Sequence, residues 1–156
     1  MCLILDANRF GEALSTPPNP DYRPIIDWLT ASTSAGMVVF GGTKFLREID
    51  RSTRARRWFI ELQRAGRAKS IDRAAVDAEE KALRARGLCF SDDEHLVALA
   101  RTSGARVFCT EDAALFKDVR NPALLSKPRG RVYRTKRHVA LLCHNARCQR
   151  PPQRTR

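Results

Sequence analysis

The chain has 156 residues, which suffices for one domain with a buried core and is short for two. Hydrophobic residues make up 43% of it, but no apolar run approaches the ~18 residues of a membrane-spanning helix, so we expect no membrane partner. A formal net charge of +12 favours a polyanionic partner, most commonly nucleic acid.

The positive charge is concentrated at the C-terminus. Residues 119–156 hold 11 of the 29 basic residues and none of the 17 acidic residues, so residues 1–118 are nearly neutral. A basic arm on a near-neutral domain suggests phosphate contacts whose strength falls with salt. The alternative is a solubilising tail, above all for the final QRPPQRTR, which cannot bury a core.

Short apolar runs alternate with helical segments from the N-terminus onward. CLIL (2–5) has no basic leader before it and is predicted to be a buried strand rather than a signal peptide, which favours a cytoplasmic protein. Prolines in the next loop exclude a helix before about residue 24. A helix then begins near Pro24, with Gly36 placed to end it, and MVVF (37–40) is the second predicted strand.

The same alternation continues to residue 134. Gly41 and Gly42 make a tight exit from the second strand, and Thr43 is expected to cap the next helix. The remaining predicted elements are helices over 44–49 and 55–66, a strand over 68–71, a helix from Asp72 to Gly87, a helix from about Ser91, and strands over 105–110 and 130–134.

This order predicts repeated βαβ units. The expected fold is a single α/β domain over residues 1–134, with a parallel sheet flanked by helices on both faces and right-handed crossovers. Residues 135–156 form a basic C-terminal extension that we expect to be partly disordered. In such folds ligands bind at the edge formed by the C-terminal ends of the strands.

SDDEHLVALA (91–100) places an acid at the head of an apolar helical face. The residues that share its i, i+3, i+4, i+7 spacing are Asp93, Leu96, Val97 and Ala100. The alternative is helix-start chemistry, because Ser91 and Glu94 have the spacing of a capping box and the helix dipole favours acids in the first turn.

Four acids are expected at the ligand-binding edge. They are Asp6 after the first strand, Glu48 in the helix after the second, Asp93 before the fourth strand and Asp112 after it. Clustered carboxylates repel one another and raise one another's pKa unless a cation intervenes, and no Lys or Arg is equally well placed. Mg²⁺ or Mn²⁺ suits such an all-oxygen site. Taken singly, Asp6 fits a turn, Glu48 a solvated helix and Asp112 an N-cap.

A zinc site is the competing arrangement of metal ligands. Cys143, His144 and Cys148 lie close together in the sequence, with His138 upstream, but they contain no C-x2-C pair.

The segments LILDAN, DEHLVALARTSGARVFCTED and LFKD, with an acid in the helix after the second strand, resemble the PIN domain. This is a fold of metal-dependent ribonucleases that includes many bacterial toxins of toxin–antitoxin pairs. The resemblance spans roughly residues 2–134, and its most specific part runs from Asp93 to Asp112. It implies that Asp6, Glu48, Asp93 and Asp112 are the metal-binding and catalytic acids, with Asn8 and Thr110 as polar supports. Asp118 would be an accessory acid or, as its position favours, a surface residue.

The resemblance implies an Mg²⁺- or Mn²⁺-dependent endoribonuclease that hydrolyses phosphodiester bonds of RNA. A toxin would have a protein antitoxin as partner, and HVALLCHNARC (138–148) could serve as a terminal helix, an antitoxin-binding face or a homo-oligomer contact. No covalent nucleophile is needed, and we expect His95 to be a surface residue.

The run Arg51, Arg54, Arg56 and Arg57 is a candidate RNA-binding wall, with Trp58 and Phe59 available for stacking. Arg64 and Arg67 follow on the same segment. The alternative, compatible with the first, is that Trp58, Phe59 and Leu62 face the core while the arginines are solvated.

Two further functions remain open. A catalytically inactive PIN-like module would bind RNA or a partner in the presence of chelator and after Asp93→Asn. A receiver-like phosphotransfer domain would need a lysine near the end of a late strand, and no clear candidate follows a strand.

Overall fold

The computed structural model describes residues 2–33 and 36–142. They form one five-stranded sheet in the order β3-β2-β1-β4-β5, and every neighbouring pair is parallel. The strands are β1 (Cys2–Leu5), β2 (Met37–Gly41), β3 (Ala68–Ile71), β4 (Val107–Cys109) and β5 (Arg131–Tyr133). The predicted α/β fold with a parallel sheet is confirmed, and each of the last two strands is one or two residues shorter at either end than its predicted range.

Strand β1 is the centre of the sheet and is buried along its whole length. Leu3 pairs with Val38 of β2 on one side and with Val107 of β4 on the other. The ladder continues one residue past β1, because the Asp6 N–H donates to the Cys109 carbonyl at 3.0 Å. This pairing brings the residues after β1 and β4 side by side.

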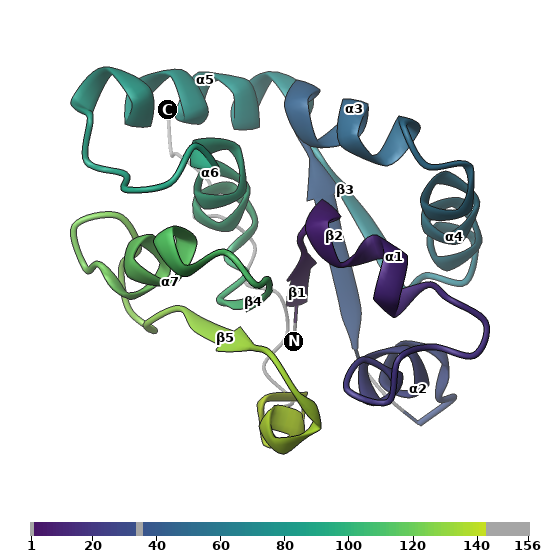
Figure 1. Ribbon diagram of the computed structural model, residues 1–156. Helices are drawn as coiled ribbons and strands as arrows, with labels where there is room; N and C mark the ends of the chain where they lie inside the picture. The colour runs from purple at the N-terminus through teal and green to yellow at the C-terminus, as the bar shows by residue number, and fades with distance from the viewer. Residues whose placement is uncertain (1, 34–35, 143–156) are drawn as a thin grey trace.

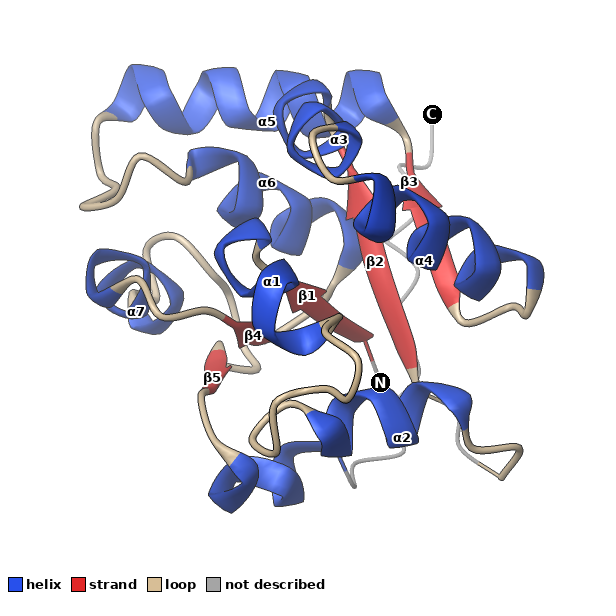
Figure 2. Cartoon of the chain, turned by 45° about the vertical axis from the view of Figure 1, so that its right-hand side comes forward, coloured by secondary structure: helices blue, strands red, loops and turns tan. Residues whose placement is uncertain are grey.

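Helices cover both faces of the sheet (Figures 1 and 2). Those of the first half are the 3-10 turn Ala7–Arg9, α1 (Phe10–Ala13), α2 (Arg23–Thr30), α3 (Thr43–Asp50) and α4 (Thr53–Arg64). The expected absence of a helix before about residue 24 is wrong, because α1 ends at Ala13, ahead of the first proline of that loop, Pro17. Those of the second half are α5 (Arg73–Arg86), α6 (Glu94–Ser103), α7 (Ala113–Arg120) and the 3-10 helix η2 (Lys136–Leu142). Helices α1, α2 and α4 lie on one face, and α6 and α7 lie on the other. None of the described helices is long and apolar enough to cross a membrane.

Aromatic packing joins the helices of the first face. The Phe59 ring of α4 lies 5.8 Å from Phe10, 5.2 Å from Phe40 and 6.3 Å from Phe45, measured between ring centroids. Phe59 and Leu62 are buried, so the core-facing role expected for this side of α4 is confirmed. This packing therefore fixes the orientation of α4, and the sides of the helix that do not face the core are exposed to solvent.

Three predicted helix signals have different outcomes. Asp72 caps α5 by accepting a hydrogen bond from the Ala75 N–H, and Gly87 ends the helix in the left-handed conformation, both as expected. Helix α2 ends at Thr30, well before Gly36. Gly36 has another role, because a Cβ there would collide with the Trp28 ring.

Thr43 does not cap α3; it is the first residue of that helix. Its N–H and hydroxyl donate to the Asp77 carboxylate of α5 at 2.8 and 2.6 Å. These hydrogen bonds lower the pKa of Asp77. A distant carboxylate therefore takes the capping role that the local sequence suggested for Thr43.

The end of β5 and the described start of the C-terminal extension both contact the segment before α2. The Tyr133 hydroxyl donates to the Asp21 carbonyl at 2.6 Å, and the Lys136 N–H donates to the Asp21 carboxylate at 3.1 Å. Leu142, at the end of η2, is buried. Most of HVALLCHNARC, including three of the four zinc candidates, lies outside the described residues.

Candidate functional site

Asp6 directly follows β1 at the carboxyl edge of the sheet and is 7% exposed. Its carboxylate accepts a hydrogen bond from the Thr110 hydroxyl at 2.7 Å and a longer one from the Asn8 N–H at 3.4 Å. Burial raises the pKa of Asp6, these hydrogen bonds lower it, and the nearby Glu48 carboxylate raises it further; the net direction is upward. Asp6 is thus held in place by neutral donors.

The Thr110 hydroxyl links two of the four acids. Besides donating to Asp6, it accepts a hydrogen bond from the Asp112 N–H at 3.1 Å. Thr110 is fully buried, so this link is shielded from water. Asn8 contributes only its backbone N–H to the carboxylate, and its side chain is exposed.

Asp93 is the N-cap residue of α6, but its carboxylate makes no capping hydrogen bond. Its side chain is 22% exposed. Burial, the charge of Asp6 and a hydrogen bond with Asp112 raise the pKa of Asp93 to about 6, while the nearby His95 and Lys44 act in the lowering direction. The acid at the head of the apolar face is therefore directed at other acids rather than at its helix.

The capping box predicted from Ser91 and Glu94 is wrong, because the helix begins beyond Ser91. The Ser91 hydroxyl instead donates to Asp118 at 2.6 Å and accepts from the Asp93 N–H at 3.2 Å. Asp112 is the N-cap of α7, through the Ala114 N–H at 2.8 Å, as the alternative interpretation expected; its carboxylate also meets Asp93, and its metal-binding role stays a prediction.

His95 is 1% exposed, so its expected surface position is wrong. Its Nε2 lies 3.1 Å from a carboxylate oxygen of Glu48. Its Nδ1 lies 3.9 Å from the Asp93 carboxylate and has no hydrogen-bond partner among the described residues. Helix α6 is buried along all of residues 95–100, so the imidazole is enclosed between two of the acids.

A cation lies closer to the acids than we expected from the sequence. The Lys44 ammonium of α3 donates to the Asp92 carbonyl at 2.8 Å. Its charge acts to lower the pKa of Asp93. Lys44 remains solvent-accessible, and it is placed where it could meet an anion at this edge.

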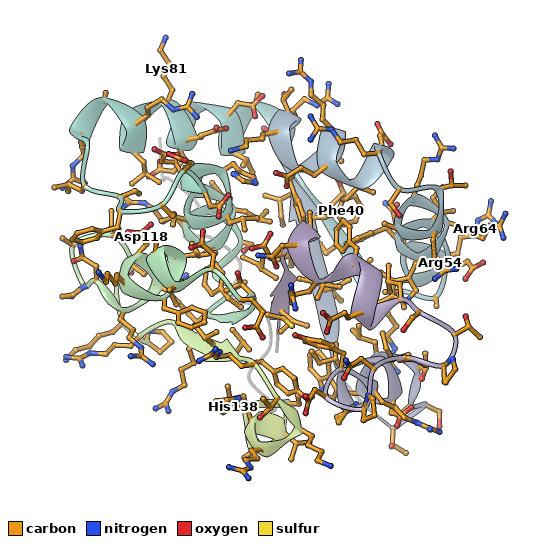
Figure 3. The ribbon with its side chains drawn as sticks, in the orientation of Figure 1. Phe40, Arg54, Arg64, Lys81, Asp118 and His138 are labelled. Atoms are coloured by element: carbon orange, nitrogen blue, oxygen red, sulfur yellow. The ribbon has the colours of Figure 1, made fainter. Side chains whose placement is uncertain are left out.

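Asp118 is fully buried, so the expected surface position is wrong, and its contacts give it a structural role. Its carboxylate accepts from the Phe90 N–H at 2.7 Å, the Ser91 N–H at 3.0 Å and the Ser91 hydroxyl. Asp118, labelled in Figure 3, therefore anchors the loop that leads into Asp93.

A polar chain that sequence reasoning missed flanks the same edge. The Tyr22 hydroxyl accepts from Arg9 and donates to Glu111, each at 3.3 Å. Arg134 donates to the same Glu111 carboxylate at 3.4 Å and stacks over the Phe116 ring. The segments after β1, β4 and β5 are thereby tied together beside Thr110 and Asp112.

The four predicted acids are brought together at one edge. Asp6 interacts electrostatically with Glu48 and Asp93, and Asp93 contacts Asp112. As these side chains lie, no group of three or more His, Cys, Asp or Glu among the described residues is arranged to hold a metal ion.

The predicted arginine wall lies elsewhere, at the end of α3 and along α4. Arg51, Arg54, Arg56 and Arg57 are exposed, and Trp58 is half-buried. Arg67 serves the fold by donating to the Ala31 carbonyl at 2.7 Å. Solvated arginines on a helix with a buried apolar side are thus confirmed, and their RNA-binding role stays a prediction.

No protein-family model matches the chain, and no curated protein or solved structure is significantly similar to it.

Proposed function

We propose that this protein is an Mg²⁺- or Mn²⁺-dependent endoribonuclease of the PIN type, with Asp6, Glu48, Asp93 and Asp112 as the residues that hold the ion. The observation that carries the proposal is the use of the Asp93 carboxylate. It is directed toward Asp6 and Asp112 rather than at its own helix, at the cost of a raised pKa. A bound divalent cation would offset this repulsion.

The donor chemistry fits a hard cation, because all four predicted ligands are carboxylates. The unpartnered Nδ1 of His95 is a second, independent sign of a missing polar partner at the cluster. A bound Mg²⁺ or Mn²⁺ would supply Lewis acidity toward the scissile phosphate and a more acidic water.

The residues of the chain would prepare this chemistry in different ways. Thr110 fixes the Asp6 carboxylate and the backbone of Asp112. His95 holds the Glu48 carboxylate at 3.1 Å, so Glu48 can orient a water as well as bind the ion. Lys44 offers a cation to a phosphate at the same edge. The toxin assignment adds an antitoxin partner and rests on the resemblance alone.

The direct test is cleavage of mixed-sequence single-stranded RNA by the purified protein, with Mn²⁺ or Mg²⁺ and with chelator. Cleavage should be lost in chelator and in Asp93→Asn, whereas Asp27→Asn, which alters an exposed acid of α2, should cleave like the wild type. Cleavage that persists in chelator, or in Asp93→Asn, would contradict the proposal.

One observation favours a second function, RNA binding without cleavage. None of the five exposed arginines on α4 and just before it, Arg51, Arg54, Arg56, Arg57 and Arg64, forms an ion pair within the described part of the chain. Tight RNA binding in chelator that is unchanged in Asp93→Asn, with no cleavage in any metal, would select this function.

A further inference from the structure

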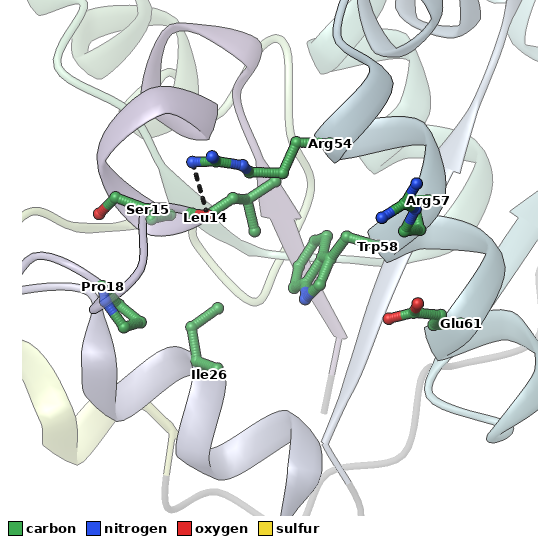
Figure 4. Close-up of a pocket in the computed structure, with 9 residues that line it drawn as sticks. Leu14, Ser15, Pro18, Ile26, Arg54, Arg57, Trp58 and Glu61 are labelled. Atoms are coloured by element: carbon green, nitrogen blue, oxygen red, sulfur yellow. Dashed lines mark hydrogen bonds between the residues drawn. The ribbon is translucent and has the colours of Figure 1, made fainter.

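A pocket of about 190 Å³ opens between α4 and the segment that joins α1 to α2 (Figure 4). Its apolar lining includes Leu14, Pro18, Ile26 and the half-buried Trp58. The volume is several times the ~30 Å³ that one water occupies in the liquid. The pocket is separate from the acids, but α1 and the preceding turn lead from Asp6 directly to its wall.

Trp58 gives the pocket a flat aromatic wall whose orientation is fixed. Its ring packs edge-on against the buried Phe59, with 5.0 Å between centroids. No described residue hydrogen-bonds to its indole N–H. An aromatic face that is half-covered by protein and half-open to a pocket suits a planar ring, because stacking needs a flat surface and little else.

Two of the three charged residues that line the pocket are arginines. Arg54 donates to the Leu14 carbonyl at 3.3 Å and so lies across the mouth of the pocket, while Arg57 stands beside the indole (Figure 4). Neither arginine is paired with a carboxylate in the described residues. Glu61, also in the lining, supplies a hydrogen-bond acceptor.

The cations extend beyond the pocket. Arg56 and Arg64 line an adjacent hollow of about 400 Å³ that shares Arg57 and Glu61 with the first pocket. Unpaired guanidinium groups beside an aromatic face match the alternation of phosphate and base in a single-stranded nucleic acid. A protein segment would find the apolar lining but would leave these charges without partners.

We propose that the pocket binds one base of single-stranded RNA, stacked on Trp58, with Arg57 contacting the neighbouring phosphate and Glu61 accepting a base N–H. The choice of RNA rests on the proposed function, and the pocket would hold part of the substrate away from the scissile bond. Because every base has an aromatic face, the pocket adds affinity with little sequence preference.

The test is a fluorescence titration in chelator, where cleavage cannot contribute. The chain has two tryptophans, so Trp28→Phe leaves Trp58 as the only reporter. A single-stranded adenylate oligonucleotide should quench its fluorescence at the same concentrations at which fluorescence anisotropy of labelled RNA reports binding. Trp58→Leu should weaken binding about tenfold, whereas Trp58→Phe, which keeps an aromatic face, should retain most of the affinity.

The phosphate contact has its own readout. Arg57→Gln should reduce the slope of log affinity against log salt by about 0.7, the value for one phosphate contact to a single strand. Lys81→Gln is the matched control, because Lys81 points away from the body on α5, far from Arg54 and Arg64 (Figure 3). Melting curves of all variants should show the folded protein.

Three results with RNA alone would overturn the inference: no RNA binding at all, RNA binding that leaves Trp58 fluorescence unchanged, or equal affinities for wild type and a folded Trp58→Leu. Quenching by an apolar peptide but not by RNA would assign the pocket to a protein partner and would also overturn it. The proposed nuclease function is tested separately. If RNA quenches Trp58 fluorescence but is not cleaved in any metal, the nuclease function is rejected and RNA binding in the pocket is retained.

Discussion

Asp118 is fully buried and the acids of the carboxyl edge are buried or half-buried, but their partners differ. Asp118 accepts three hydrogen bonds, two from backbone N–H groups and one from a hydroxyl, all from the loop before α6. Asp93 meets Asp6 and Asp112 instead, and its pKa is raised to about 6. An acid surrounded by donors stabilises the fold, whereas acids that face one another repel and cost stability, a cost that the proposed cation would offset.

The largest expected change in stability comes from substituting Asp118. Asp118→Ala leaves three donors without an acceptor in a closed environment, so we expect a loss of about 3 kcal/mol or more in the free energy of unfolding. Denaturant unfolding would measure it. The exposed Asp27→Ala serves as the control and should change stability little. A small loss of stability in Asp118→Ala would contradict the structural role that distinguishes Asp118 from the acids of the carboxyl edge.

The next effect is stabilisation by metal. If the acids bind a cation only in the folded state, Mn²⁺ at 100 times its dissociation constant should add about 2.7 kcal/mol of stability. Thermal unfolding with and without Mn²⁺ measures this gain, which should largely disappear in Asp93→Asn. Asp118→Asn, if it folds, should keep the gain. A melting curve that does not respond to metal would count against the acids as a cation site.

The pH dependence sharpens the comparison further. A raised pKa in the folded state means that Asp93 favours folding below its unfolded pKa near 3.8, and this contribution is lost as pH rises through about 6. In the absence of metal, Asp93→Asn should therefore raise stability at pH 7 by about 1 to 2 kcal/mol and flatten the pH profile between about 4 and 6. Denaturant unfolding across this range would show it, and a lower stability of the variant at pH 7 would contradict the repulsion.

The smallest expected change in stability concerns Asp77, whose carboxylate accepts hydrogen bonds at the start of α3. Its pKa is lowered by the hydrogen bonds from Thr43, so its contribution is present above the unfolded pKa and is lost as pH falls through the folded pKa, the opposite sign to Asp93. Asp77→Ala should cost about 1 kcal/mol at pH 7, the usual loss of an N-cap. Equal melting temperatures for the variant and the wild type at pH 7 would show that this cap is dispensable.

Much of the site followed from local patterns. Strand ends and helix starts are marked by short apolar runs and by Gly or Asp residues, and parallel strands bring their carboxyl ends to one edge. These patterns alone place Asp6, Glu48, Asp93 and Asp112 together, whereas the position of Thr110 beside them was implied by the family resemblance. The buried face of α4 with Phe59 and Leu62 follows from the same helical spacing.

The errors concern side chains whose partners are distant in the sequence. Asp118 contacts a backbone N–H 28 positions away, Asp77 a residue 34 positions away, and His95 a residue 47 positions away. A polar residue at such a position looks like a surface residue when only its neighbours are considered, because its local spacing carries no information about what will pack on it.

The sequence by itself determined the order of the strands and of the longer helices, the parallel sheet and the edge at which the acids meet, because these depend on local periodicity and on chain direction. Only the tertiary structure decided which carboxylates receive donors and which face other carboxylates, and that Trp58 borders a pocket. Burial, hydrogen bonding and electrostatic repulsion depend on segments that meet only after the chain has folded.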